Sequence, residues 1–203
     1  MCENMKICCV LKTGGEYGEQ HVENLHLMCQ RWIPDVEFVC LTDIKSPLFE
    51  CVSLTEKLPG WWSKMELFDK FRDGSWLFFD LDTIIRKSVS LDFLNGQQFV
   101  ILRDFYRGRT IKSAMGSGVM FWNGDHSWIW NAFKTRGRNG FRGDQDFLEV
   151  AFLEAKRSPT YFQDITSQIA SYKADNKGRD APIVAFHGKP RPWQQQDIPY
   201  PAT

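Results

Sequence analysis

The sequence predicts an α/β fold in which a mixed, mainly parallel sheet is flanked by helices. The first observation behind this prediction is the order of patterns at the start of the chain. The apolar run Met5–Leu11 leads through a glycine-rich turn into an amphipathic segment at 19–32, and a second apolar run covers 36–42. Strand, helix and strand in this order form a βαβ unit, whose strands are parallel. The second observation is length, because 203 residues suffice for a single domain, 1–203, with its own core.

The individual elements follow from apolar spacing and from residues that begin or end helices. Within 19–32, apolar residues recur at helical spacing, and Pro34 ends the helix. Ser63 and Glu66 have the spacing of a capping box, which predicts a helix that begins there. Further strands are expected at 49–54, 75–85, 99–102, 116–124 and 183–186, and helices at 63–71, 125–135, 144–155 and 164–171. The polar, proline-containing tail 194–203 is expected to be extended.

The overall composition argues against several classes of function. The chain has 25 basic and 25 acidic side chains, so its net charge gives no support for binding nucleic acid or a membrane surface. Its start lacks the apolar core of a signal peptide, and no stretch is long enough to span a membrane. We therefore expect a soluble, cytoplasmic protein with no transmembrane segment. The cysteines lack zinc-ligand spacing and fit buried, reduced thiols instead: Cys2, Cys8, Cys9, Cys29, Cys40 and Cys51.

The segment Ser75–Ile85 combines the pattern of a buried strand with two acids. Large apolar residues surround Asp80 and Asp82 on both sides. In a continuous strand, residues two positions apart point to the same face, so the two carboxylates project together and repel each other. A shared hard cation such as Mg²⁺ or Mn²⁺ relieves this repulsion and prefers carboxylate oxygens. The alternative is a strand end whose two acids are simply hydrated.

A late segment, His187–Trp193, offers chemistry that complements the two aspartates. It directly follows the last predicted strand. His187 is suited to complete a metal site, Gly188 leaves room for close approach to the backbone, and Lys189 is suited to neutralise a diphosphate. The alternative is that His187 caps the strand and Lys189 is solvated.

Four short motifs follow one another along the chain. They are Phe79–Thr83 (Phe-Asp-Leu-Asp-Thr), Ser117–Val119 (Ser-Gly-Val), Gly143–Gln145 (Gly-Asp-Gln) and His187–Trp193 (His-Gly-Lys-Pro-Arg-Pro-Trp). Together they resemble family 8 glycosyltransferases of the GT-A fold, the group of glycogenin-like and bacterial galactosyltransferase-like enzymes. The segment Trp61–Phe68 is similar to one found in small bacterial or phage members. The resemblance covers most of the chain and implies the GT-A fold, a Rossmann-like fold of nucleotide-diphospho-sugar transferases.

This resemblance implies a hexosyltransferase that moves a sugar from a UDP-sugar, with retention of configuration, to an unknown glycan, lipid or protein acceptor. The implied cofactor is Mn²⁺ or Mg²⁺, held by Asp80, Asp82 and His187 and acting as a Lewis acid on the leaving UDP. The implied contacts to the nucleotide-sugar come from Thr13, Tyr17, Lys64, Asp104, Ser117, Gly188 and Lys189. Asp144 and Gln145 are the implied catalytic residues, and either is the candidate if an enzyme nucleophile forms.

Two other functions stay open. Haloacid-dehalogenase-type phosphatases also carry Asp-x-Asp after an apolar strand, with the first aspartate as nucleophile, but they place it near the N-terminus, whereas a βαβ unit precedes it here. A non-catalytic module that binds a nucleotide-sugar or a glycan is the other alternative. It stays open because Gly116 stands where typical family members carry Asn, and Phe141 where some carry an acid. The chain is also short for the fold, so we expect the basic loop 136–143 or a partner to help form the acceptor pocket.

Overall fold

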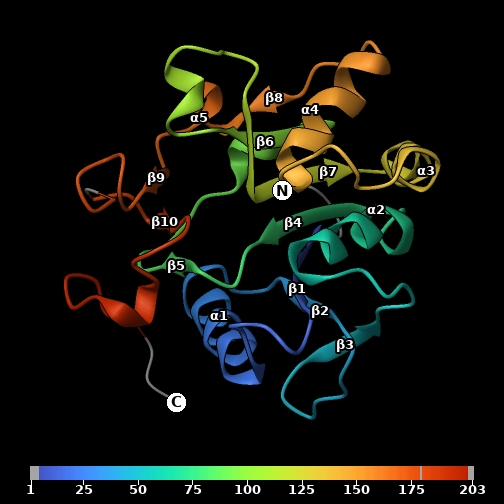
Figure 1. The fold of residues 1–203 in the computed structure, drawn as a ribbon. Helices are drawn as coiled ribbons and strands as arrows, with labels where there is room; N and C mark the ends of the chain where they lie inside the picture. The colour runs from blue at the N-terminus through green and yellow to red at the C-terminus, as the bar shows by residue number, and fades with distance from the viewer. Residues whose placement is uncertain (1–4, 179, 201–203) are drawn as a thin grey trace.

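The computed structural model describes residues 5–178 and 180–200, and its centre is a seven-stranded mixed sheet. The strands lie in the order β3-β2-β1-β4-β7-β6-β8 (Figure 1). Neighbouring strands are parallel except at β7, which is antiparallel to both β4 and β6. The predicted α/β fold with a mainly parallel sheet is therefore confirmed. The strands of this sheet are β1 Met5–Leu11, β2 Glu37–Thr42, β3 Glu50–Ser53, β4 Ser75–Phe79, β6 Phe99–Arg103, β7 Met115–Asn123 and β8 Thr160–Tyr161.

A second, three-stranded sheet brings a late segment of the chain beside the strand that follows the two aspartates. Its central strand β10 (Ile183–Ala185) is antiparallel to β5 (Thr83–Ile85) and parallel to β9 (Ile169–Ser171). Ala185 pairs with Thr83, one residue after Asp82. The register of this small sheet therefore places the residues after β10 next to the Asp-x-Asp segment.

Helices and the small sheet cover the two faces of the large sheet (Figure 1). One apolar cluster joins one face to α1 and to the small sheet, and a second cluster joins the opposite face to α2, α3 and α4. The α-helices are α1 Glu19–Trp32, α2 Leu67–Lys70, α3 Ser127–Arg136, α4 Asp144–Glu154 and α5 Phe162–Ile165. The 3₁₀ helices are η1 Gly60–Glu66, η2 Asp92–Leu94, η3 Arg107–Arg109 and η4 Pro192–Gln194.

The predicted strand 75–85 is broken at the two aspartates. β4 ends at Phe79, and the backbone N–H of Thr83 donates to the carbonyl of Asp80 at 2.9 Å, which closes a turn. β5 then leaves the large sheet and pairs with β10. The expectation of one continuous strand is wrong, because β5 finds its hydrogen-bonding partner at the far end of the sequence. Leu81 turns into the core as expected and is 5% exposed.

The predicted helix 63–71 is replaced by η1 and the single helical turn α2. The predicted capping box does not form. The Ser63 hydroxyl donates to the carbonyl of Leu58, and the Glu66 carboxylate accepts from the backbone of Thr55 and Glu56. The two side chains anchor the preceding loop instead of the helix start, and η1 begins earlier, at Gly60. As a result, Trp61 and Lys64 lie on one short 3₁₀ helix.

The predicted helix 164–171 is also wrong. The chain makes only the short α5 here and then extends as β9, in which Ile169 pairs with Ile183 and Ser171 pairs with Ala185. The apolar spacing of this segment fits a short strand as well as a helix. Its pairing with β10 decides in favour of the strand.

The described part of the predicted tail, up to residue 200, folds back toward α1. Ile198 is 2% exposed, and the amide of Gln195 donates to the carbonyls of Pro192 and Ile198. Residues 201–203 lie outside the described residues. Cys8, Cys9, Cys29 and Cys40 are buried free thiols and Cys51 is a partly buried one, whereas Cys2 lies outside the described residues. Over residues 5–178 and 180–200, every helix is too short or too polar to cross a bilayer.

Candidate active site

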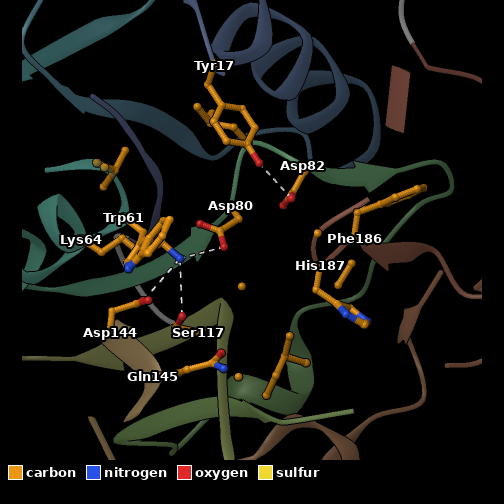
Figure 2. Close-up of a pocket in the computed structure, with 18 of the residues that line it drawn as sticks. Tyr17, Trp61, Lys64, Asp80, Asp82, Ser117, Asp144, Gln145, Phe186 and His187 are labelled. Carbon is orange, nitrogen blue, oxygen red and sulfur yellow. Dashed lines mark hydrogen bonds and ion pairs between the residues drawn. The ribbon is translucent and has the colours of Figure 1, made fainter. Parts of the chain in front are cut away.

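A cavity of about 490 Å³ opens at the ends of the central strands β1, β4 and β7 and beside the residues that follow β10 (Figure 2). Most of the predicted site residues line it, namely Tyr17, Lys64, Asp80, Asp82, Asp104, Ser117, Asp144, Gln145, His187 and Gly188. The carboxyl ends of parallel strands are the usual ligand site of open α/β sheets. The sequence motifs thus converge on one cavity, although they lie far apart along the chain.

A buried lysine, Lys64, joins three of the motifs in this cavity. Its Nζ lies 2.8 Å from Asp80 Oδ2, 3.4 Å from Asp144 Oδ2 and 3.5 Å from Ser117 Oγ (Figure 2). Burial alone would lower the pKa of Lys64, but the two carboxylates raise it above its usual value. Lys64 is therefore a fixed positive charge. Through these contacts Lys64 connects the turn after β4, the strand β7 and the start of α4.

Asp82 has different partners, one of which the sequence reasoning missed. The Tyr17 hydroxyl donates to Asp82 Oδ2 at 3.0 Å, and the guanidinium of Arg191 forms an ion pair with the same oxygen. Burial raises the pKa of Asp82, and Arg191 and Tyr17 oppose that rise. Arg191 also binds Glu16 Oε2 at 2.8 Å, which ties the His-Gly-Lys-Pro-Arg segment to the loop after β1. Its position in that motif was the only sequence signal for this contact.

Asp80 is held mainly by Lys64. Burial raises the pKa of the Asp80 carboxyl, and the positive charge of Lys64 opposes this rise. Repulsion from Asp82 raises the pKa of Asp80 further. Two carboxylates whose pKa values are both raised gain most from a nearby cation. Their oxygens fit a hard divalent ion.

His187 lines the same cavity, but its ring points away from the two aspartates (Figure 2). Its Nε2 lies 2.7 Å from Ser171 Oγ, and its ring stacks on Phe105 with centroids 5.6 Å apart. Burial lowers the pKa of His187, which favours the neutral, ligating form of the imidazole. Within the described residues, no three His, Cys, Asp or Glu side chains form a ready metal cluster. The residues therefore fit a metal in part, because Asp80 and Asp82 line the cavity but the His187 ring is turned to Ser171.

Three predicted nucleotide-sugar contacts have other positions or partners. Thr13 does not line the cavity, and its N–H and hydroxyl both donate to Asp43, at 3.0 and 2.9 Å. Lys189 is exposed and is not part of the cavity wall, although its neighbour Gly188 is. Asp104 lines the cavity, but its carboxylate also accepts from the N–H groups of Tyr106 and Arg107 at 2.9 and 2.8 Å. The loop geometry after each strand, which the sequence does not specify, decides these positions.

Two side chains that the sequence reasoning gave no role also shape the site. Trp61, 58% exposed, lies beside the Lys64–Asp144 ion pair and lines the cavity (Figure 2). Asp43, at the end of β2, holds Thr13 and pairs with Lys12, itself a cavity residue. Trp61 lies in the segment Trp61–Phe68 that resembles family members, and Asp43 directly follows the second predicted strand.

Comparison with solved structures relates this fold to glycosyltransferases. The galactosyltransferase LgtC, solved with donor and acceptor sugar analogs, matches 95% of this chain over 90% of its own, with a TM-score of 0.61 and 13% identity. The glycosyltransferase GlyE of Streptococcus pneumoniae TIGR4 matches 96% of this chain, with a TM-score of 0.68 and 12% identity. The bifunctional WbbM matches 93%, with a TM-score of 0.60 and 10% identity. This chain spans 57% of the GlyE chain and 46% of the WbbM chain.

No protein-family model matches the sequence. No curated protein matches it either. The fold is that of the glycosyltransferases above, as the resemblance to GT-A enzymes implied.

Proposed function

We propose that the chain is a metal-dependent glycosyltransferase that takes a hexose from a UDP-sugar and transfers it to an acceptor hydroxyl. The observation that carries the proposal is the convergence of Asp80, Asp82, Asp144 and Gln145 on one cavity, within a fold shared with glycosyltransferases. A phosphatase of the haloacid-dehalogenase type is not favoured, because the fold matches glycosyltransferases and a complete βαβ unit precedes Asp80.

Asp80 and Asp82 are the proposed ligands of Mn²⁺ or Mg²⁺, and His187 joins them after its ring rotates away from Ser171. Such an ion, when bound, supplies Lewis acid chemistry at the diphosphate. Two internal cations offset the charge of these aspartates. Lys64 pairs with Asp80, and Arg191 pairs with Asp82. A diphosphate that enters the pocket adds negative charge, and in this proposal Lys64 and Arg191 form charge-assisted hydrogen bonds with it.

Tyr17, Gly188 and Lys189 are the proposed contacts to the nucleotide end of the donor. Tyr17 and Gly188 lie on the cavity wall, and Lys189 is an exposed residue next to Gly188 in the sequence. Thr13 contributes indirectly to the nucleotide end, because its hydrogen bonds to Asp43 anchor the loop that carries Tyr17. Asp104 and Ser117 lie with Lys64 on the side where the donor sugar is expected.

In the proposed transfer, the bond from the anomeric carbon to the β-phosphate oxygen breaks, and its electron pair leaves with UDP. The acceptor oxygen bonds to the anomeric carbon, and its proton passes to the departing phosphate or to water. Lys64 orients the Asp144 carboxylate, since its Nζ lies 3.4 Å from Asp144 Oδ2. In this proposal Asp144 and Gln145 stabilise positive charge that develops on the sugar ring. Retention of configuration is part of the proposal.

The test is release of UDP from a panel of UDP-hexoses, with Mn²⁺, with Mg²⁺ and with a chelator. We expect metal-dependent UDP release from one or a few donors. The expected loss in Asp82→Asn, together with normal release in the distant surface variant Lys134→Met, would assign the activity to this cavity. UDP binding without release from any donor would favour the non-catalytic module instead. Hydrolysis of a phenyl phosphate in the absence of nucleotide would favour a phosphatase.

A further inference from the structure

A second cavity, of about 320 Å³, adjoins the first at the start of α4. The two cavities share one wall, formed by Trp61, Asp144 and Gln145. A group bound in the second cavity therefore contacts the proposed catalytic residues without contacting Tyr17 or Asp82, which line only the first cavity. This is the position that a second substrate needs if it is to meet the donor sugar at Asp144 and Gln145.

The shared wall carries an unusually exposed aromatic ring. Trp61 is 58% exposed, whereas its neighbour Trp62 is 6% exposed and packs in the core. In a 3₁₀ helix, residues three apart lie above one another, so Trp61 stands over Lys64 on η1. The indole Nε1 lies 3.6 Å from where a Cβ on Gly143 would stand, so the ring lies across the start of α4. Its position is fixed by η1 and α4, while much of its surface is free.

The charges around the second cavity cancel. Arg107 and Arg142 line it together with Asp144 and Asp146. Arg142 grips Asp146 through two hydrogen bonds, at 2.7 and 3.1 Å, and Arg107 lies 3.5 Å from the same carboxylate. Such a balanced wall offers donors and acceptors to hydroxyl groups but no excess charge for an anionic or cationic ligand. It favours a neutral, hydroxyl-rich molecule.

The shape of the cavity limits the ligand further. Among the described residues that line it, Trp61 is the one large apolar side chain, so the wall offers no groove for an acyl chain. Its volume is at the low end of the range of about 300–1,000 Å³ for small-molecule sites. One exposed indole face beside polar groups suits the C–H face of a pyranose ring, because the aromatic face carries negative charge density.

We infer that this second cavity is the acceptor site, that the acceptor is a neutral saccharide, and that Trp61 is the platform on which its sugar ring stacks. This inference rests on the proposed function, since it names the substrate class of that same site. Trp61 is a specificity-determining residue here. It selects a sugar ring with an exposed C–H face over a lipid or a peptide.

The experiment follows the indole N–H signal of Trp61 by NMR in the protein bound to UDP and Mg²⁺. Its absence in Trp61→Phe identifies that signal. The probes are methyl β-galactoside, methyl α-glucoside, lactose and maltose, with a Ser/Thr-containing peptide and a long-chain alcohol as comparators. We expect at least one saccharide to shift the Trp61 signal. In Trp61→Ala, its Kd is expected to rise about tenfold, which corresponds to about 1.4 kcal/mol.

Leu153→Ala is the matched control, because Leu153 is an exposed apolar residue of α4 that lines neither cavity. It should leave the saccharide Kd unchanged, and Trp61→Phe should keep most of the affinity because a ring remains. Saccharide binding that is equal in the parent and in Trp61→Ala would overturn the inference. So would a Trp61 signal that shifts with none of the saccharides, or with the peptide or the alcohol alone. Absence of UDP binding, measured separately on the parent, would instead contradict the proposed function.

Discussion

Replacing Lys64 with methionine should show how much of the protein's stability depends on the positive charge of Lys64. Lys64 is 7% exposed, and its ammonium group holds both Asp80 and Asp144. Methionine has a similar length and flexibility, so Lys64→Met removes the charge while filling most of the space. The two carboxylates then face each other without a counter-charge.

The size of the effect follows from the burial of the three groups. Removing one partner of a buried ion pair costs about 3–5 kcal/mol, because the remaining charge stays desolvated. The side chain of Asp144 is 8% exposed, but that of Asp80 is 29% exposed and keeps some hydration. We therefore expect the lower end, about 3 kcal/mol of unfolding free energy. For a domain of this size that is a fall of about 6–12 °C in Tm.

The assay is urea unfolding at pH 7, with Tm from calorimetry, on the parent, on Lys64→Met and on Lys134→Met. Lys134 forms an ion pair with Glu56, but their side chains are 49% and 39% exposed, so its loss should cost less than about 1 kcal/mol. Adding Asp144→Asn to Lys64→Met should recover part of the loss, because one of the two uncompensated charges disappears. If Lys64→Met proves as stable as the parent, Lys64 does not hold the site together and the reasoning is refuted.

Further predictions concern the metal and the edge of the site. Asp82→Ala should abolish metal-dependent UDP binding in calorimetry while the protein remains folded by circular dichroism, and residual metal-dependent binding would remove Asp82 from the ligand set. His187→Ala should weaken Mn²⁺ binding, and an affinity equal to the parent's would disprove the three-ligand site. Burial would raise the pKa of Asp43, but Lys12 and Thr13 lower it from 3.8 to about 2, so its stabilisation is present above about pH 4 and lost as the pH falls through about 2. Asp43→Asn should remove on the order of 1 kcal/mol from unfolding at about pH 5 and little at about pH 2, and an equal loss at both would contradict this assignment.

Elements with their own local signals could be predicted from the sequence. The helix α1 was expected at 19–32 and is observed at Glu19–Trp32, because its apolar stripe is complete and Pro34 lies just beyond it. The strand β1 was also expected at its observed bounds. In both cases the residues themselves contain the periodicity and the stop signals that define the element.

Elements that depend on distant partners could not be predicted. β9 exists because it pairs with β10, and β5 leaves the path of β4 for the same reason. A pattern of three apolar residues does not reveal which segment will lie beside it. Such short strands are therefore settled only by the assembled sheet.

For the candidate site, the sequence likewise indicated which residues are present but not how their side chains are oriented. The motif residues Asp80, Asp82 and His187 line one cavity. They did not reveal that the imidazole turns to Ser171 or that Arg191 pairs with Asp82, because these contacts depend on side-chain rotation and loop paths. Sequence motifs identify which groups are available, and packing decides which groups they meet.

We propose that this cavity binds a nucleoside diphosphate through a metal ion. Calorimetric titration of the parent protein with UDP, with Mn²⁺ and then with a chelator, tests it most directly. We expect saturable binding of one UDP per chain with Mn²⁺ and much weaker binding in its absence. No UDP binding in the presence of Mn²⁺, or binding that the chelator leaves unchanged, would contradict the claim.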